Sequence, residues 1–152
     1  MWIIEDSRQQ KDKHENKHEW WAENGDNVLR CKLPVGDYIS PPKVSIDTKQ
    51  GIREIAQNMC GSMKEKRRFR EECKLARDIG CKLIFLIEDP KYKTIDDLYG
   101  DKIWLMSKQT IPGDQLATAM HTMSNRYGVK FMFCDPAETA EIINKLLEGE
   151  DG

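Results

Sequence analysis

Two aspartates and a lysine stand close together in one stretch of the sequence, at Asp37, Asp47 and Lys49. Apolar and polar residues alternate over residues 43–49, which predicts a strand with one apolar and one polar face. Asp47 and Lys49 are two residues apart and therefore project from the same face. A turn at residues 40–42 would fold Asp37 back towards that face. Because gathered carboxylates favour a bound cation, we predict a metal-dependent site that cleaves phosphodiester bonds.

Each of these residues is given a role by the chemistry of phosphodiester hydrolysis, which needs an activated water and stabilisation of the leaving oxygen. We expect Asp37 and Asp47 to bind the metal, together with the backbone carbonyl oxygen of Thr48. Lys49 would orient or deprotonate the attacking water, and Asp6 would add a third carboxylate from the end of a first strand. Oxygen ligands favour Mg²⁺ as the cofactor, with Mn²⁺ able to substitute. The non-catalytic alternative is an Asp47–Lys49 ion pair on a surface hairpin.

The composition is that of one globular domain over residues 1–152, with 39% hydrophobic and 33% charged residues. The net charge of −2 provides no general attraction for nucleic acid, so any DNA-binding surface must be local. A basic cluster at residues 64–70 is the candidate, with the solvated face of a helix as its alternative. No apolar run approaches the length of a membrane span, and no signal peptide opens the chain. We therefore expect a cytoplasmic location, with the five cysteines reduced.

The order of predicted elements indicates an α/β fold with a central mixed β-sheet and helices on both faces. Helical spacing covers residues 52–59 and 63–79, and a continuous apolar run at residues 82–88 predicts a central strand. Residues 129–134 predict a further strand, and a helix follows to residue 147. We expect the acidic surface from Asp135 onward to be solvated or to flank a homodimer interface. Two segments are expected outside the core: residues 7–27 as a mobile polar loop or frayed helix, and residues 149–152 as a tail.

One motif within the polar segment matches H-E-x-x-H, the pattern of zinc metalloproteases, from His14 to His18. A zinc site needs packing that orients both rings, and the flanking residues are mostly charged. A solvated segment is therefore favoured over a zinc hydrolase. Trp20 and Trp21 would dock this segment onto the domain, with stacking on a nucleobase as the alternative.

Three short motifs together resemble the XPF branch of the PD-(D/E)xK nuclease superfamily, a group of structure-specific DNA endonucleases. They are Asp6-Ser7-Arg8-Gln9, Gly36-Asp37 and Asp47-Thr48-Lys49. The resemblance implies a restriction-endonuclease-like fold and a Mg²⁺-dependent endodeoxyribonuclease, acting on branched or single-stranded DNA in repair or recombination. It also implies that phosphates are contacted by Arg8, Lys66, Arg67 and Arg70. The short chain resembles a stand-alone phage or bacterial member.

The sequence departs from the family pattern at several of these positions. Gln9 replaces a glutamate, which weakens a second metal position, and Asp47 replaces the glutamate of the third motif. Thr48 replaces an arginine, and Arg53 falls where the family has an acid. The paired helix-hairpin-helix module that often follows this domain is absent from the sequence. Gln9 and the altered third motif keep a second hypothesis open, namely a catalytically inactive DNA-binding or scaffold subunit of the same fold.

Overall fold

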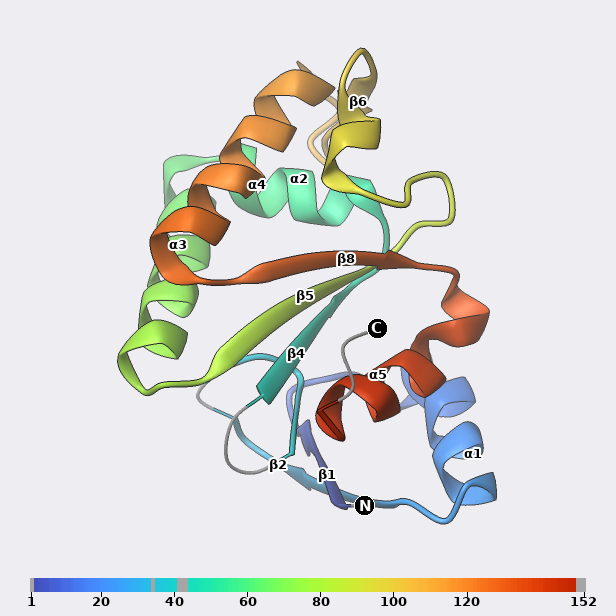
Figure 1. The fold of residues 1–152 in the computed structure, drawn as a ribbon. Coiled ribbons are helices and arrows are strands. Elements are labelled where there is room, and N and C mark those ends of the chain that lie inside the picture. The colour runs from blue at the N-terminus through green and yellow to red at the C-terminus, as the bar shows by residue number, and fades with distance from the viewer. Residues whose placement is uncertain (1, 34, 41–43, 150–152) are drawn as a thin grey trace.

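The protein is built around a six-stranded sheet with the strand order β2-β1-β3-β4-β5-β8 (Figure 1). The computed structural model describes residues 2–33, 35–40 and 44–149. Strand β3 runs antiparallel to both of its neighbours, and the other pairs are parallel. The six strands are β1 Trp2–Asp6, β2 Asn27–Cys31, β3 Tyr38–Ser40, β4 Val44–Lys49, β5 Lys82–Glu88 and β8 Lys130–Cys134. The sheet is therefore mixed, which confirms the predicted fold class.

Helices cover both faces of this sheet. Helices α2 (Ile52–Cys60), α3 (Met63–Asp78) and α4 (Gly113–Tyr127) pack on one face, and α1 (Glu15–Glu23) and α5 (Thr139–Leu147) lie on the other (Figure 1). Strand β5 has apolar residues on both of its faces, so both faces must be covered by helices. Its residues 83, 85 and 87 belong to the first core cluster, whereas residues 84 and 86 belong to the second. A strand buried on both faces reads as a continuous apolar run, as it does here.

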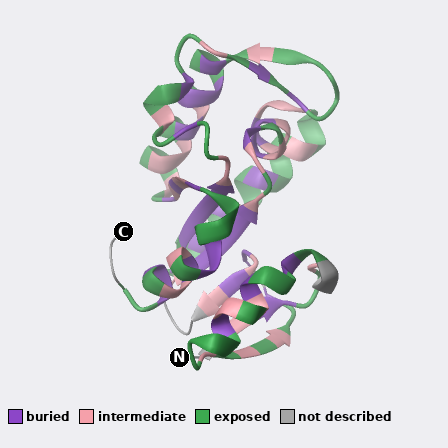
Figure 2. Cartoon of the chain, turned by 90° about the vertical axis from the view of Figure 1, so that its right-hand side faces the viewer, coloured by how far each residue is buried: buried purple, intermediate pink, exposed green. Residues whose placement is uncertain are grey.

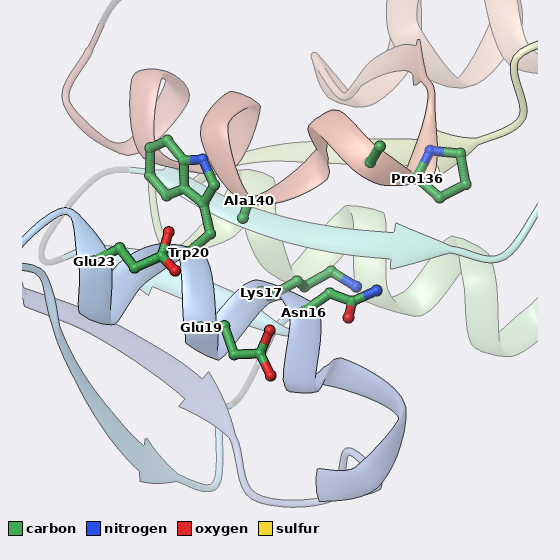
Figure 3. Close-up of a pocket in the computed structure, with 8 residues that line it drawn as sticks. Asn16, Lys17, Glu19, Trp20, Glu23, Pro136 and Ala140 are labelled. Carbon is green, nitrogen blue, oxygen red and sulfur yellow. The ribbon is translucent and has the colours of Figure 1, made fainter.

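The polar segment at residues 7–27, which was expected to be a mobile loop or a frayed helix, contains a helix. A 3-10 turn, η1 (Lys11–His14), leads directly into α1. Trp21 is fully buried, and its ring meets that of Tyr38 edge to face at 5.4 Å. Trp20 points from α1 towards α5 across a groove of about 330 Å³, which Lys17 also lines (Figure 3). The two tryptophans therefore dock this segment onto the domain.

The remaining elements lie outside the main sheet. A short hairpin pairs β6 (Lys102–Trp104) with β7 (Thr110–Pro112). Two further 3-10 turns are η2 (Ile95–Leu98) and η3 (Pro136–Glu138). Figure 2 shows that buried residues concentrate along the central strands.

Two parts of the sequence-based prediction fall on residues that are not described. In the predicted turn these are Pro41 and Pro42, and in the predicted tail they are residues 150–152. The pairing of β3 with β4 nevertheless establishes the hairpin that the turn was expected to form. Within the described residues, no helix combines the length and apolar character needed to cross a membrane.

Candidate active site

The antiparallel pairing of β3 with β4 brings Asp37 beside the end of β4. The backbone N–H of Thr48 donates to Oδ2 of Asp37 at 2.8 Å, and the Thr48 hydroxyl donates to the same oxygen at 3.3 Å. On the same strand, Nζ of Lys49 lies 3.3 Å from Oδ1 of Asp47. The structure therefore brings together Asp37, Asp47, Thr48 and Lys49. Their roles in metal binding and catalysis stay predictions.

This cluster opens onto a cavity of about 280 Å³. Asp47 lines it and is only 7% exposed, so little of its side chain reaches bulk solvent. The rest of the cavity wall is formed by residues in and before η1 and by residues at the start of α2. These wall residues are Gln9, Gln10, Lys13, His14, Gln50 and Glu54. The cavity is accessible from solvent and mostly polar, as a phosphate-binding site requires.

Gly36 fixes the direction in which Asp37 enters the site. Its backbone has a φ of +73°, a conformation that residues with a Cβ rarely adopt. A Cβ at this position would also collide with the hydroxyl of Ser45, which donates to the carbonyl of Val35 at 2.8 Å. The Gly36 N–H donates to Oε1 of Glu72 at 3.0 Å, which ties the turn to α3. The Gly-Asp pair is therefore required by local backbone geometry.

Burial and mutual repulsion make it unfavourable for all the carboxyl groups of the site to be ionised at once. Burial raises the pKa of Asp37 well above its ordinary value, and the neighbouring Asp47 raises it further, against the Thr48 N–H and Lys49, which lower it. Burial likewise raises the pKa of Glu72 to about 8, and Asp47 again adds to the effect. Two carboxyl groups next to Asp47 therefore tend to hold protons. A bound cation would replace those protons.

Lys49 is charged in this environment. Burial lowers its pKa, but the carboxylates of Asp47, Glu72 and Glu54 outweigh that effect, so that the pKa is raised overall. Its Nζ also lies 3.9 Å from Oε1 of Glu54. An ammonium group of this kind donates hydrogen bonds and stabilises negative charge, and it is a poor proton acceptor.

The oxygen ligands in the site suit Mg²⁺ better than a soft metal. In the part of the chain that the structure describes, no three His, Cys, Asp or Glu side chains converge closely enough to hold a metal ion by themselves. Mg²⁺ does not need such a cage, because it keeps several waters and binds through one or two carboxylates together with substrate phosphates. Asp37 and Asp47 supply that pair. The described residues therefore fit a Mg²⁺ ion that is completed by water and substrate.

The raised pKa of Glu72 predicts a pH-dependent loss of stability that Glu72→Gln should remove. Between its ordinary value of 4.5 and about 8, the folded protein holds a proton that the unfolded chain has released, so stability falls as pH rises. Glutamine stays neutral and keeps an amide in this position. We expect the two proteins to have similar unfolding free energies near pH ~5, and the variant to be more stable by about 2 kcal/mol near pH ~9.

Urea denaturation across this pH range, without added metal, measures the difference. Glu71→Gln is the matched control, because Glu71 is the exposed neighbour on the same helix. It should leave the pH profile unchanged. Parallel profiles for the wild type and Glu72→Gln would show that the Glu72 carboxyl has an ordinary pKa.

Asp6 and Arg8 pair with each other and do not line the cavity. The Nε of Arg8 lies 2.8 Å from Oδ2 of Asp6, and the backbone N–H of Leu33 donates to Oδ1 of Asp6 at 3.3 Å. The carboxylate that was expected to be a third metal ligand is therefore occupied. Its backbone still adjoins the site, because the Asp6 N–H donates to the carbonyl of Asp37 at 2.6 Å. Arg8 itself remains exposed, as a phosphate contact would require.

The basic residues of α3 lie elsewhere. Lys66, Arg67 and Arg70 are exposed, and Lys66 and Arg70 line a separate cavity between α3 and α4. That cavity shares no residue with the one at Asp37. The structure thus does not bring these residues to the cluster, and their contact with DNA stays a prediction.

Comparison with known proteins places this site in a family. A family model described as the ERCC4 domain matches residues 5–146. The chain belongs to this family. The ERCC4 domain fold is shared with an XPF from Aeropyrum pernix, with a TM-score of 0.67 and 19% sequence identity over 97% of this chain and 64% of that one. A second solved structure of XPF from Aeropyrum pernix, in complex with DNA, matches with a TM-score of 0.63, 19% identity, and coverage of 97% and 63%.

These comparisons confirm the superfamily that the motifs suggested. No curated protein matches the sequence significantly. The ERCC4 domain described here spans less than two thirds of the XPF chains that it resembles. Family and fold support a domain of the DNA nuclease and repair type.

Three residues of this ERCC4 domain reach the site although the sequence had not placed them in it. Glu72 contacts the Gly36 N–H, Gln9 has a buried Oε1 without a hydrogen-bond partner among the described residues, and His14 lines the cavity. Glu72 and His14 lie on helical segments whose polar composition suggested a solvated surface. The family motif had singled out Gln9 only as a lost carboxylate. Its unpaired amide oxygen is nevertheless of the type that hard cations bind.

Proposed function

We propose that this ERCC4 domain is a Mg²⁺-dependent endodeoxyribonuclease that hydrolyses phosphodiester bonds in branched or single-stranded DNA. One observation carries the proposal: Asp37 and Asp47, with Lys49 beside them, line one open cavity in a domain of this family. The XPF from Aeropyrum pernix that was solved with DNA supports DNA as the substrate. Mn²⁺ is expected to substitute for Mg²⁺.

The roles of the side chains follow from their charge and burial. Asp37 and Asp47 would hold Mg²⁺, which when bound polarises phosphoryl oxygens and lowers the pKa of water. Lys49 donates to the attacking water or to the phosphate oxygens and stabilises the charge that develops there. Because its pKa is raised, we assign Lys49 to orientation and charge stabilisation and not to proton abstraction. Thr48 holds Asp37 in place through two hydrogen bonds.

A catalytically inactive DNA-binding or scaffold subunit is the second candidate function. Two observations favour it. Gln9 lacks the carboxylate of the family motif, and Lys49 is already engaged by Asp47 and Glu54. In such a subunit the carboxylates and Lys49 would form a closed structural network, and no metal would be needed.

A cleavage assay on flap, fork, four-way junction and single-stranded DNA tests the proposal. We expect cleavage of at least one substrate that requires Mg²⁺ and stops with a chelator. Asp47→Asn should reduce the rate by about 100-fold at limiting Mg²⁺ and recover part of it at high Mg²⁺, because a metal ligand has been weakened. Asp78→Asn, which changes an exposed aspartate on α3, is the control and should cleave like the wild type.

Calorimetric titration with Mn²⁺ separates the two candidates. A nuclease should bind Mn²⁺, with an affinity that drops in Asp47→Asn. An inactive subunit should show no carboxylate-dependent binding and no cleavage of any substrate in the panel. Equal cleavage by the wild type and Asp47→Asn at limiting Mg²⁺ would contradict the assignment of Asp47.

A further inference from the structure

His14 lies at the end of η1, just before α1, and forms part of the cavity that holds Asp37, Asp47 and Lys49. The side chain is 7% exposed, so its ring is packed in the cavity wall and has little freedom to move. A histidine in this position is outside the three motifs on which the proposed function rests. Its place beside two acids and a lysine raises the question of which of its nitrogens faces a substrate.

The contacts around His14 fix the answer. Nζ of Lys17 lies 3.1 Å from Nδ1 of His14, and the same Nζ lies 3.0 Å from Oε1 of Glu88. An ammonium group paired with a carboxylate has donors only, so Nδ1 must accept its hydrogen bond. A neutral imidazole that accepts at Nδ1 carries its proton at Nε2.

The electrostatics agree with this arrangement. Burial lowers the pKa of His14, and the nearby Lys17 lowers it further, so the ring is neutral under ordinary conditions. Among the described residues, Nε2 of His14 has no hydrogen-bond partner, and His14 lines the cavity. With Nδ1 held by Lys17, Nε2 is the ring nitrogen left to donate to an occupant of the cavity.

We propose that His14 presents its Nε2–H to a phosphate oxygen of DNA bound in this cavity, and that Lys17 is the positioning residue that sets the tautomer. This inference rests on the proposed function, because it takes a DNA phosphate as the occupant of the cavity. A fixed neutral donor is suited to that role. It adds a hydrogen bond to the phosphate without adding a positive charge next to the metal-binding carboxylates.

The same contacts argue against zinc at the H-E-x-x-H motif. A histidine that binds metal through one nitrogen donates from the other to an acceptor, and Lys17 is not an acceptor. The second histidine of the motif, His18, lies 2.7 Å from Oε2 of the fully buried Glu5. The two rings are thus engaged by different partners and do not converge on one ion.

Three substitutions test the donor at His14. His14→Ala removes it, His14→Gln places an amide N–H near the position of Nε2, and His121→Ala changes an exposed histidine next to Asp96 as a control. With the DNA that the wild type cleaves best, we expect His14→Ala to lower kcat/KM by about 10- to 100-fold. His14→Gln should stay within about threefold of the wild type, and His121→Ala should be unchanged. His14→Asn, whose amide is one methylene shorter, should resemble His14→Ala.

A second measurement keeps this test independent of catalysis. Fluorescence anisotropy with labelled single-stranded DNA and Ca²⁺ reads phosphate binding whether or not the chain cleaves. We expect weaker binding, by about fivefold or more, for His14→Ala and His14→Asn only. If the wild type fails to cleave, the nuclease proposal fails while the binding series still decides the role of His14. Equal binding and equal cleavage by all variants would overturn the inference, as would equal losses in His14→Gln and His14→Ala, which would indicate a packing role.

Discussion

Lys49→Ala is expected to lower the single-turnover cleavage rate by more than about 1,000-fold, equivalent to about 4 kcal/mol of transition-state stabilisation. The ammonium group lies 3.3 Å from Oδ1 of Asp47, and Lys49 lines the cavity together with both aspartates. Without it, the cluster loses the ammonium group that stabilises the negative charge developing on the phosphate. Rates with enzyme in excess over the best-cleaved DNA measure the chemical step directly.

The metal dependence of this variant distinguishes Lys49 from the aspartates. Removing the ammonium frees Asp47 from its ion pair, so the affinity for Mn²⁺ should stay the same or increase. Raising Mg²⁺ should therefore not restore cleavage, in contrast to Asp47→Asn. Lys64→Ala is the matched control, since Lys64 is exposed at the start of α3. Cleavage by Lys49→Ala within threefold of the wild type would show that Lys49 is only a structural partner of Asp47.

The elements that carry this cluster were predictable because they follow simple patterns. Strand β4 alternates, and β5 is continuously apolar because it is buried on both faces. The alternation alone predicts that the side chains of Asp47 and Lys49 project from the same face of the strand. The position of Asp37 also required the hairpin, which the glycine and the prolines indicated.

The sequence left residues 7–27 open between a mobile loop and a frayed helix, because the buried face of α1 is partly polar. Its inward positions include Lys17 and Trp21, four residues apart, and Lys17 is buried through its ion pair with Glu88. A periodicity argument counts a lysine as a solvent-facing residue, so the sequence did not show a continuous buried face on this helix.

Glu72 was missed for a related reason. Its partner is the backbone N–H of Gly36, which is distant in the sequence, and no local pattern reports such a contact.

Lys17→Met is expected to lower the free energy of unfolding by about 3 kcal/mol. Nζ of Lys17 lies 3.0 Å from Oε1 of Glu88, and the two side chains are only 9% and 11% exposed. Removing the cation leaves a carboxylate buried without its counter-charge, which is far more costly than the loss of an exposed pair. Urea denaturation of the two proteins gives the difference.

A double-mutant cycle separates the ion pair from simple packing. Lys17→Met combined with Glu88→Gln should recover more than half of the lost stability, because the neutral amide no longer needs a cation. Lys145→Met is the matched control, since Lys145 pairs with Glu141 at 3.5 Å while both side chains are about half exposed. It should cost less than about 0.5 kcal/mol. Additive losses in the double variant would mean that Lys17 and Glu88 stabilise the fold independently.

The double variant also separates the fold from the site. Its recovered stability would come without the donor that holds Nδ1 of His14, because methionine offers no N–H. The ring could then carry its proton on either nitrogen. We therefore expect the double variant to be folded but to bind labelled DNA more weakly than the wild type and more tightly than His14→Ala, because one of the two tautomers still donates from Nε2. Wild-type DNA binding in that variant would show that Lys17 contributes to stability and leaves the tautomer of His14 unaffected.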